Sequence, residues 1–193
     1  MADDTLTATL ERGSCPHMAV LLRDEDELPA VLASFYALGA KRGALCVHRA
    51  WIGERETARE RFAAAGLDVD GLEAAGVLEV VEFDPDESPE ASAAHWRERL
   101  DAALREGFTA LWYARFAAGA DEELYRSVDA YERAWEEAFH GLPVVTLCPY
   151  VVGALHAVSA LSRLAEVTEM HDGVLVPAAS GGFALVERAV AER

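Results

Sequence analysis

Residues 131–150 read YERAWEEAFHGLPVVTLCPY, and this stretch decides the fold class. It begins as the second half of an amphipathic helix, breaks at the His-Gly-Leu-Pro segment 140–143, and continues as an apolar run from Val144 to Cys148. A helix, a tight break and a buried strand in succession are typical of α/β domains. We therefore predict a strand at 144–148 that is followed by a polar exit holding Cys148 and Tyr150. Polar groups beyond a central strand lie where open α/β sheets bind ligands.

The same alternation extends through the chain. Short apolar runs indicate buried strands, and apolar residues at helical spacing indicate helices. Strands are expected at 17–22, 44–48, 77–83, 109–114 and 144–148. Helices are expected at 28–38, 54–65, 89–106, 121–139 and 152–164, with a short helical connector at 67–75. This order predicts an α/β fold, a three-layer sandwich with a mostly parallel central sheet and helices on both faces.

Three segments have a less definite assignment. Glu79 and Glu82 interrupt the apolar run at 77–83, which favours a place at or near an edge of the sheet. The short apolar runs at 174–176 and 182–186 are compatible with strands, and the second is equally compatible with the start of a terminal helix. Residues 1–16 are predicted to be a flexible leader, and 17–193 a single domain.

The charge balance limits the possible partners. The chain has 17 Lys and Arg residues against 34 Asp and Glu residues, a net charge of −17. Direct nucleic-acid binding and attachment to an anionic membrane both depend on basic residues, so both are disfavoured. No apolar run approaches the roughly 18 residues of a membrane span, and no signal peptide is recognisable. A cytoplasmic location is expected.

The usual nucleotide-binding and hydrolytic motifs are absent. After the first predicted strand the chain reads Arg23-Asp24-Glu25-Asp26, where a Walker A loop or a GxGxxG turn would supply glycines. An acidic turn repels phosphate, so ordinary ATP hydrolysis is disfavoured. Neither GxSxG nor HExxH occurs. The sequence therefore predicts no catalytic residue, no cofactor and no metal.

The cysteines and histidines leave two alternatives open. The three cysteines, Cys15, Cys46 and Cys148, form no CxxC pair, which argues against a disulfide framework or a thiolate zinc cluster. Cys148 is interpreted first as a small buried apolar residue. One alternative is a Cys/His-dependent enzyme, with Cys148 as the nucleophile and His17 or His171 as the base.

The other alternative is a redox or metal sensor built from Cys46, His48 and Cys148. Cys46 and His48 are expected to point to the same face of one strand, because side chains repeat every two residues. No third ligand lies close by in the sequence.

Four short motifs, taken in order, resemble one sensory family. They are His17 at the start of the first strand, Tyr131-Glu132 in the long helix, Cys148-x-Tyr150, and His171-x-Gly-Val-Leu-Val. Their order and spacing, over roughly residues 17–177, resemble the MEDS domain, the methanogen/methylotroph, DcmR-type sensory domain. The resemblance implies a RecA-like sheet without a working P-loop. It also implies a non-enzymatic sensing role for a small organic signal.

The expected output of such a domain is a change in signal transduction or transcription through a separate regulatory protein. A kinase, a sigma-factor regulator and a DNA-binding protein are the partner classes considered, and a homodimer is a further expectation. No direct contact with nucleic acid or membrane is expected.

The ligand-binding residues are predicted from the carboxyl rim of the sheet and from the resemblance. They are His17, Arg23, Arg49, Trp51, Arg115, Phe116, Tyr131, Glu132, Cys148, Tyr150 and His171. The aromatic side chains would supply apolar walls, and the arginines would bind an anionic group. Two structural alternatives stay open. The arginines can instead pair with the protein's own carboxylates, and Tyr131-Glu132 can be a core tyrosine beside a polar partner for His17.

Overall fold

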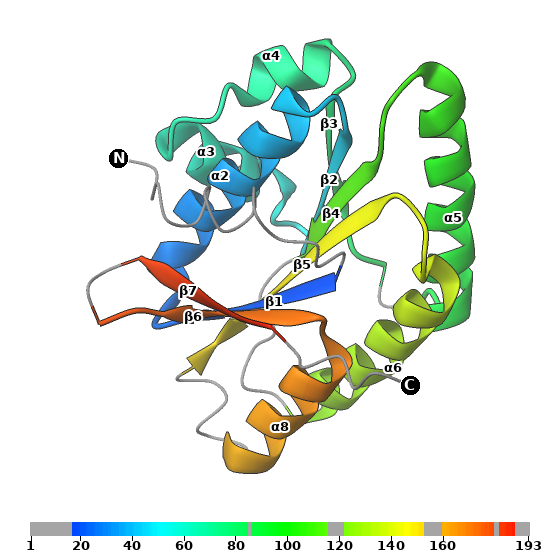
Figure 1. The fold of residues 1–193 in the computed structure, drawn as a ribbon. Helices are drawn as coiled ribbons and strands as arrows, with labels where there is room; N and C mark the ends of the chain where they lie inside the picture. Colours follow the sequence, from blue (N-terminus) through cyan, green and yellow to red (C-terminus); the bar gives the residue numbers. More distant parts are fainter. Residues whose placement is uncertain (1–16, 85, 116–121, 153–159, 180–181, 188–193) are drawn as a thin grey trace.

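A single sheet of seven strands forms the centre of the molecule, in the order β3-β2-β4-β5-β1-β6-β7 (Figure 1). The computed structural model describes residues 17–84, 86–115, 122–152, 160–179 and 182–187, without the side chains of 122–129 and 160–163. The strands are β1 His17–Leu22, β2 Leu45–Ala50, β3 Leu78–Glu82, β4 Leu111–Arg115, β5 Val144–Val151, β6 Gly173–Pro177 and β7 Phe183–Glu187. All neighbouring pairs are parallel except β6 and β7, which are antiparallel. The predicted α/β class with a mostly parallel sheet is confirmed.

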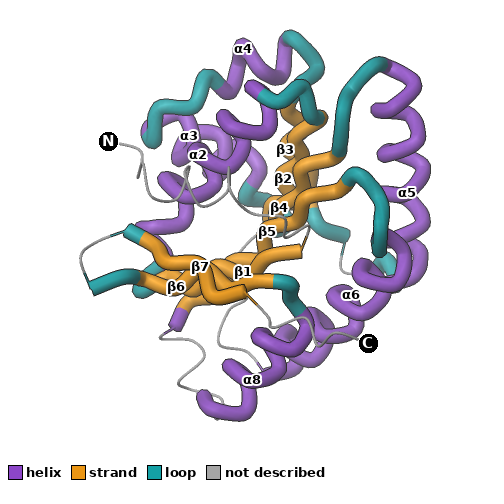
Figure 2. The backbone as a smooth tube through the Cα atoms, in the orientation of Figure 1, coloured by secondary structure: helices purple, strands orange, loops and turns teal. Residues whose placement is uncertain are grey.

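Helices cover both faces of this sheet, as Figure 2 shows. One face carries the short 3₁₀ helix η1 Glu25–Glu27 and helices α2 Leu28–Lys41, α3 Arg55–Ala64 and α4 Val69–Ala74. The other face carries α5 Pro89–Glu106, α6 Glu122–Phe139 and α8 Ala160–Met170. None of the helices in the described part of the chain is long and apolar enough to cross a membrane.

Local sequence accounts for the helix boundaries. The Ser88 hydroxyl accepts a hydrogen bond from the Ala91 amide at 3.2 Å, and Pro89 occupies the first turn of α5. Gly107, with φ of +100°, ends that helix in the left-handed conformation that glycine adopts without steric cost. Both ends of α5 therefore follow from their residues and coincide with the predicted range 89–106.

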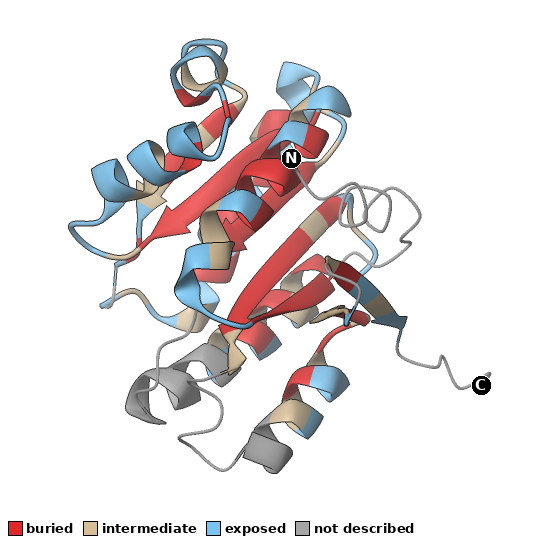
Figure 3. Ribbon diagram, turned by 90° about the vertical axis from the view of Figure 1, so that its left-hand side faces the viewer, coloured by how far each residue is buried: buried red, intermediate tan, exposed pale blue. Residues whose placement is uncertain are grey.

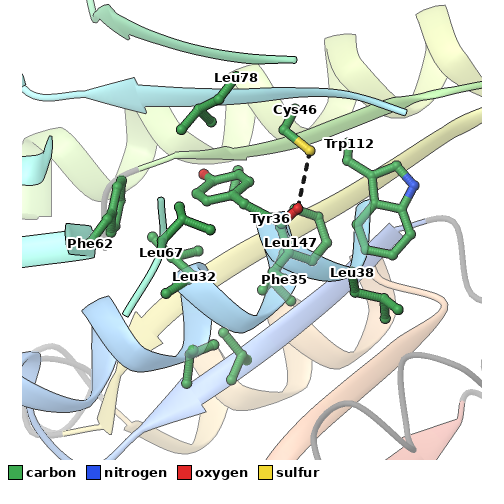
Figure 4. Close-up of a cluster of buried hydrophobic side chains, with 14 of the residues drawn as sticks. Leu32, Phe35, Tyr36, Leu38, Cys46, Phe62, Leu67, Leu78, Trp112 and Leu147 are labelled. Atoms are coloured by element: carbon green, nitrogen blue, oxygen red, sulfur yellow. Dashed lines mark hydrogen bonds between the residues drawn. The ribbon is translucent and has the colours of Figure 1, made fainter. Parts of the chain in front are cut away.

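The central strands β1, β2, β4 and β5 are buried because a helix layer lies on each side (Figure 3). On the α2 face, alternate residues of β1 such as Met18, Val20 and Leu22 join the largest apolar cluster, part of which Figure 4 shows. On the other face, Leu111 and Tyr113 of β4 pack beneath α5 and α6. This double burial explains why the strands read as continuous apolar runs rather than alternating ones.

The structure corrects two sequence-based assignments and decides a third that was left open. β5 does not end before the polar residues but runs on to Val151, so Cys148 and Tyr150 are buried inside a strand. The two unassigned apolar runs form the antiparallel pair β6 and β7, not a terminal helix. Within the described residues, the helix nearest the C-terminus is α8, at 160–170, which ends later than the predicted helix 152–164. Part of that predicted helix and the predicted leader 1–16 lie outside the described residues. The edge position of β3 is confirmed.

Gly39 lets α2 approach the sheet closely, and this leads to a stability prediction. A methyl group at Gly39 would lie 2.8 Å from Cys46 Sγ and 2.9 Å from the Trp112 ring. We expect Gly39→Ala to lower the free energy of unfolding by about 1–3 kcal/mol. Alanine's intrinsic helix preference over glycine, about 1 kcal/mol, acts in the opposite direction. Urea unfolding measures the net effect, and adding Cys46→Ala should restore part of the loss. A Gly39→Ala chain as stable as the wild type would contradict the tight packing.

Candidate functional site

Glu132 of α6 is the centre of a buried polar cluster on the sheet face beneath that helix. Its Oε2 atom lies 3.0 Å from His17 Nε2 and 3.5 Å from Cys148 Sγ. Its Oε1 atom accepts hydrogen bonds from the Tyr150 hydroxyl, at 3.1 Å, and from the Arg115 guanidinium. Glu132 is only 3% exposed, so one carboxylate inside the protein joins three neighbouring strands.

Strand pairing explains why these side chains meet. β5 lies between β4 and β1, and His17 is in register with Thr146. Thr146, Cys148 and Tyr150 point to the same face because side chains alternate along a strand. That is the face on which α6 packs. The cluster thus lies on the sheet under α6, rather than beyond the carboxyl ends of the strands where the sequence placed it.

Two histidines lie side by side at one end of the cluster. The rings of His17 and His171 have centroids 4.3 Å apart. His171 directs Nδ1 to the backbone carbonyl of Val167 at 2.7 Å, while its Nε2 makes no hydrogen bond to any of the residues that the structure describes. That Nε2 lies 3.9 Å from Glu132 Oε1. One donor atom from each of His17, Glu132, Cys148 and His171 lies within 4.8 Å of the other three.

The electrostatics of the cluster are dominated by compensating charges. Burial opposes a charge on Glu132, but the Arg115 guanidinium and His17 outweigh it and hold the pKa of Glu132 well below its usual range. Burial likewise opposes a charge on His17, but its partners Cys148, Glu132 and Glu136 raise the pKa of His17 well above the ordinary value. Glu132 is therefore ionised, and His17 is protonated, near neutral pH.

The other two members are neutral. Burial, followed by the Glu132 carboxylate, raises the pKa of the Cys148 thiol. Burial, followed by the nearby His17 charge, lowers the pKa of His171 to about 4. The cluster consequently holds a thiol and a neutral imidazole next to a charged Glu–His pair.

Two cavities adjoin the cluster. A narrow one of about 20 Å³ is bounded on its polar side by Arg115, Glu132 and Cys148 and elsewhere by Ser92, Ala93, Tyr113, Tyr131 and Trp135. A wider one of about 200 Å³ reaches His17 and Glu136 from the amino end of the sheet. The first has room for about one water molecule.

The eleven predicted site residues divide into groups. His17, Arg115, Glu132, Cys148, Tyr150 and His171 come together in the cluster. Tyr131 is next to it: this side chain lines the narrow cavity, and its hydroxyl donates to the Glu87 carbonyl. Trp51 lies apart, stacked on Phe83 at 5.4 Å between ring centroids. Phe116 lies outside the described residues.

The arginines bind the protein's own carboxylates. Arg23 contacts Glu27, with Nη1 2.5 Å from Oε1, and lies away from the cluster. Arg49 is buried and donates to Ser92 Oγ and to Glu87 Oε2, both at 2.5 Å. Arg115 pairs with Glu132. All three arginines therefore form ion pairs within the protein, which is the structural alternative that the sequence left open.

Cys46 and His48 do not join Cys148, so the predicted trio for a redox or metal sensor is wrong. Cys46 Sγ lies 3.5 Å from the backbone oxygen of Tyr36 in the α2-side core, which Figure 4 shows. His48 Nδ1 lies 2.9 Å from the Tyr36 hydroxyl on that same side. Cys148 contacts Glu132 on the opposite face. The sheet itself separates the two thiols.

Three neighbours of the cluster were missed by sequence reasoning. Glu136 Oε2 lies 3.2 Å from His17 Nδ1, and Trp135 donates to Thr146 Oγ1 at 2.8 Å. Glu136 follows Glu132 by one helical turn, so helical spacing alone was a usable signal. No comparable local signal marks Trp135 or Thr146, which meet only through the packing of α6 on β5.

Comparison with known proteins agrees with this architecture. The family model described as the methanogen/methylotroph, DcmR sensory domain, MEDS, matches residues 16–172. The chain belongs to the MEDS family. Its fold is RecA-like: a KaiC-like protein from the hyperthermophilic archaeon Pyrococcus horikoshii has a similar structure, with a TM-score of 0.55 and 17% sequence identity. That match covers 84% of this MEDS chain and 71% of the archaeal chain. No curated protein sequence matches.

The environment of Cys148 in this MEDS domain leads to a labelling prediction. Thiols react as thiolates, and both the burial and the raised pKa of Cys148 oppose that form. We expect iodoacetamide at neutral pH to leave Cys148 almost unlabelled in the folded chain and to label it rapidly in denaturant. Peptide mass spectrometry separates this site from the other cysteines, and Cys46, which is buried on the opposite face, is the matched control. Rapid labelling of Cys148 alone would instead indicate a reactive nucleophile.

Proposed function

We propose that this MEDS domain is a non-enzymatic sensor, which binds a very small organic molecule in the narrow cavity beside Glu132 and signals through α6. The observation that carries the proposal is the position of Glu132. This one buried side chain on α6 holds β1, β4 and β5 together and also forms part of the cavity wall. A molecule that contacts it changes the attachment of α6 to the sheet.

The size of the cavity supports a small ligand. A volume of about 20 Å³ corresponds to about one water molecule. A compound with one carbon and one or two further heavy atoms fits after small side-chain movements, whereas a nucleotide does not. The walls combine aromatic rings with an arginine, a carboxylate and a thiol, a mixture suited to a small molecule with one polar group.

Two features support binding rather than catalysis. Cys148 lies 3.5 Å from His17 Nε2, the arrangement of a nucleophile and base, but the raised pKa of Cys148 keeps it a thiol. In the turn after β1, carboxylates accept from the backbone amides that a phosphate would need. Glu27 accepts from the Arg23 amide at 2.8 Å, and Asp24 accepts from the Asp26 amide at 3.0 Å.

We propose that the exposed side of α6 transmits the signal to a partner protein. The helix directs Glu132 and Trp135 inward, while Arg133 and Glu137 on its other side are exposed. A separate regulatory protein that contacts this side would respond to movements of the helix. With a net charge of −17, the domain favours a partner with a basic surface.

A panel of one-carbon compounds tests the proposal. Methanol, methylamine, formate and dichloromethane are added at millimolar concentration to the full chain, and binding is followed by ligand-observed NMR. Hydrogen exchange of residues 131–139 is measured in parallel. We expect at least one compound to bind and to change exchange in α6.

A matched pair of variants locates the binding site. Ala93 lines the cavity and Ala94 on the same helix is exposed, so Ala93→Val should abolish binding and Ala94→Val should not. Absence of binding by the whole panel, or equal binding by both variants, would overturn the proposal.

A further inference from the structure

His17, Glu132, Cys148 and His171 have the donor chemistry of a metal site. Once a metal displaces the protons of His17 and Cys148, the four residues offer two imidazole nitrogens, a thiolate sulfur and a carboxylate oxygen, and all four side chains are buried. This mixture suits a borderline divalent ion such as Zn²⁺, whereas Mg²⁺ and Ca²⁺ prefer oxygen ligands only.

The separations between the donor atoms fit a tetrahedral centre. Bonds of about 2.0–2.3 Å to zinc place neighbouring ligand atoms roughly 3.3–3.6 Å apart. Here the pairs are 3.0 Å for His17 Nε2 to Glu132 Oε2 and 3.5 Å for Cys148 Sγ to each of those atoms. His171 Nε2 completes the set, with all four donor atoms inside 4.8 Å. The three pairs among His17, Glu132 and Cys148 need shifts of only a few tenths of an ångström, whereas His171 Nε2 would move by up to about 1 Å to reach bonding distance.

His171 supplies an independent indication of a missing partner. Its Nδ1 faces the Val167 carbonyl, which only accepts, so Nδ1 carries the proton and Nε2 of the neutral ring carries a lone pair. That lone pair is fully buried, makes no hydrogen bond to any residue that the structure describes, and lies within 4.8 Å of donor atoms of His17, Glu132 and Cys148. A metal ion among these atoms would satisfy it.

The surrounding groups orient the four donors as outer ligands do in metal sites. Glu136 accepts from His17 Nδ1 at 3.2 Å, so Nε2 of that ring is directed to the centre. Arg115 and Tyr150 hold Glu132 Oε1, which leaves Oε2 for coordination. With His17 deprotonated by the metal, the Cys148 thiolate and the Glu132 carboxylate balance a divalent ion, and the partly exposed Glu136 balances Arg115, so the site is neutral overall.

We propose that His17, Glu132, Cys148 and His171 bind one Zn²⁺-like divalent transition-metal ion. The wider cavity, which reaches His17 and Glu136, is its entry path. The narrow cavity touches two of the four ligands, Glu132 and Cys148. The site goes beyond the proposed sensing of a small molecule: the two proposals share Glu132, but the metal site rests on the set of four donor atoms and on the buried His171 Nε2.

Metal titration of the chelator-treated full chain tests the site. A competing chromophoric chelator measures Zn²⁺ affinity and stoichiometry, and Co²⁺ reports geometry through its visible spectrum. We expect one equivalent per chain, tetrahedral d–d bands and a thiolate-to-cobalt charge-transfer band. Cys148→Ser should abolish that band and, like His171→Phe, weaken binding by about 100-fold or more, while Glu136→Gln should weaken it by roughly 10-fold.

The other face of the sheet supplies the matched control. Cys46→Ser replaces a thiol that is equally buried but lies outside the cluster, so it should leave the affinity and the spectrum unchanged. Circular dichroism confirms that each variant is folded. An octahedral Co²⁺ spectrum, or equal affinity in wild type and Cys148→Ser, would mean binding to surface carboxylates and would overturn the site.

The two proposals fail separately. Zinc binding without any effect of the one-carbon panel keeps the metal site and rejects the small-molecule sensor. Binding of a panel compound by a chain that takes up no zinc does the reverse.

Discussion

Glu132→Gln should lower the free energy of unfolding by about 3–5 kcal/mol, the cost of removing one partner from a buried ion pair. Gln keeps the shape of the side chain but removes the charge that compensates Arg115 and His17, both of which are buried with it. Urea unfolding of the metal-free chain at pH 7 measures the change, and the melting temperature should fall on the order of 10 °C.

Glu137→Gln is the matched control for this experiment. It makes the same chemical change on the same helix, but at an exposed position. Its effect should stay within about 0.5 kcal/mol. If Glu132→Gln were equally mild, the buried carboxylate would not be the element that holds α6 to the sheet.

His48 should make the chain sensitive to acid. It is buried between Tyr36 and Phe62, and this burial lowers the pKa of His48 to about 3 from an ordinary 6.5. Because the pKa is lower in the folded state, the unfolded chain binds more protons between these two values. The stability contributed by neutral His48 is therefore complete above about pH 6.5 and is lost as the pH falls towards 3. At pH 5 the loss relative to pH 7 is about 2 kcal/mol.

His48→Asn isolates this contribution. Asn does not titrate and can still hydrogen-bond to the Tyr36 hydroxyl, so urea unfolding at pH 7, 6 and 5 should show a shallower decline than the wild type. The pKa of His171 is also lowered, so this residue adds to the acid sensitivity. It is present in both the wild type and His48→Asn, so its effect cancels when their stabilities are compared. His95→Asn, at an exposed position, should follow the wild type. Parallel pH profiles for wild type and His48→Asn would refute the assignment.

Local patterns accounted for most of the architecture. The apolar runs located β1 to β5, and the Ser88-Pro89 start and Gly107 end of α5 were recognisable from residue type alone. The acidic turn after β1 correctly excluded a Walker A loop, since Asp24 and Glu27 accept from the amides of that turn. These features depend on neighbours in sequence, which is why sequence reasoning found them.

Which residues form the cluster depends on the order of the strands in the sheet, and no local sequence pattern indicates that order. The pairing of His17 with Glu132 was considered as a structural alternative, but the convergence of both with Cys148 and His171 requires β1 to lie between β5 and β6. The end of β5 was placed too early because Pro149 and Tyr150 read as an exit, whereas Pro149 is paired with Val20 in the sheet. Arg23 and Trp51 lie elsewhere because Arg23 pairs with Glu27 and Trp51 stacks on Phe83.

The cluster also sets a condition on how the chain folds. His17 contacts Glu132 and Cys148 at sequence separations of 115 and 131 residues, and its backbone amide donates to Asp172 at a separation of 155. Contacts between residues so far apart in the sequence slow folding, because the chain loses the entropy of closing a long loop before the contact stabilises it. During synthesis on the ribosome, β1 is made before the other strands. His17 can contact its partners only after nearly the whole domain has been synthesised. The polar centre therefore closes only after residue 172 has been made, and a nascent chain shorter than this cannot assemble it.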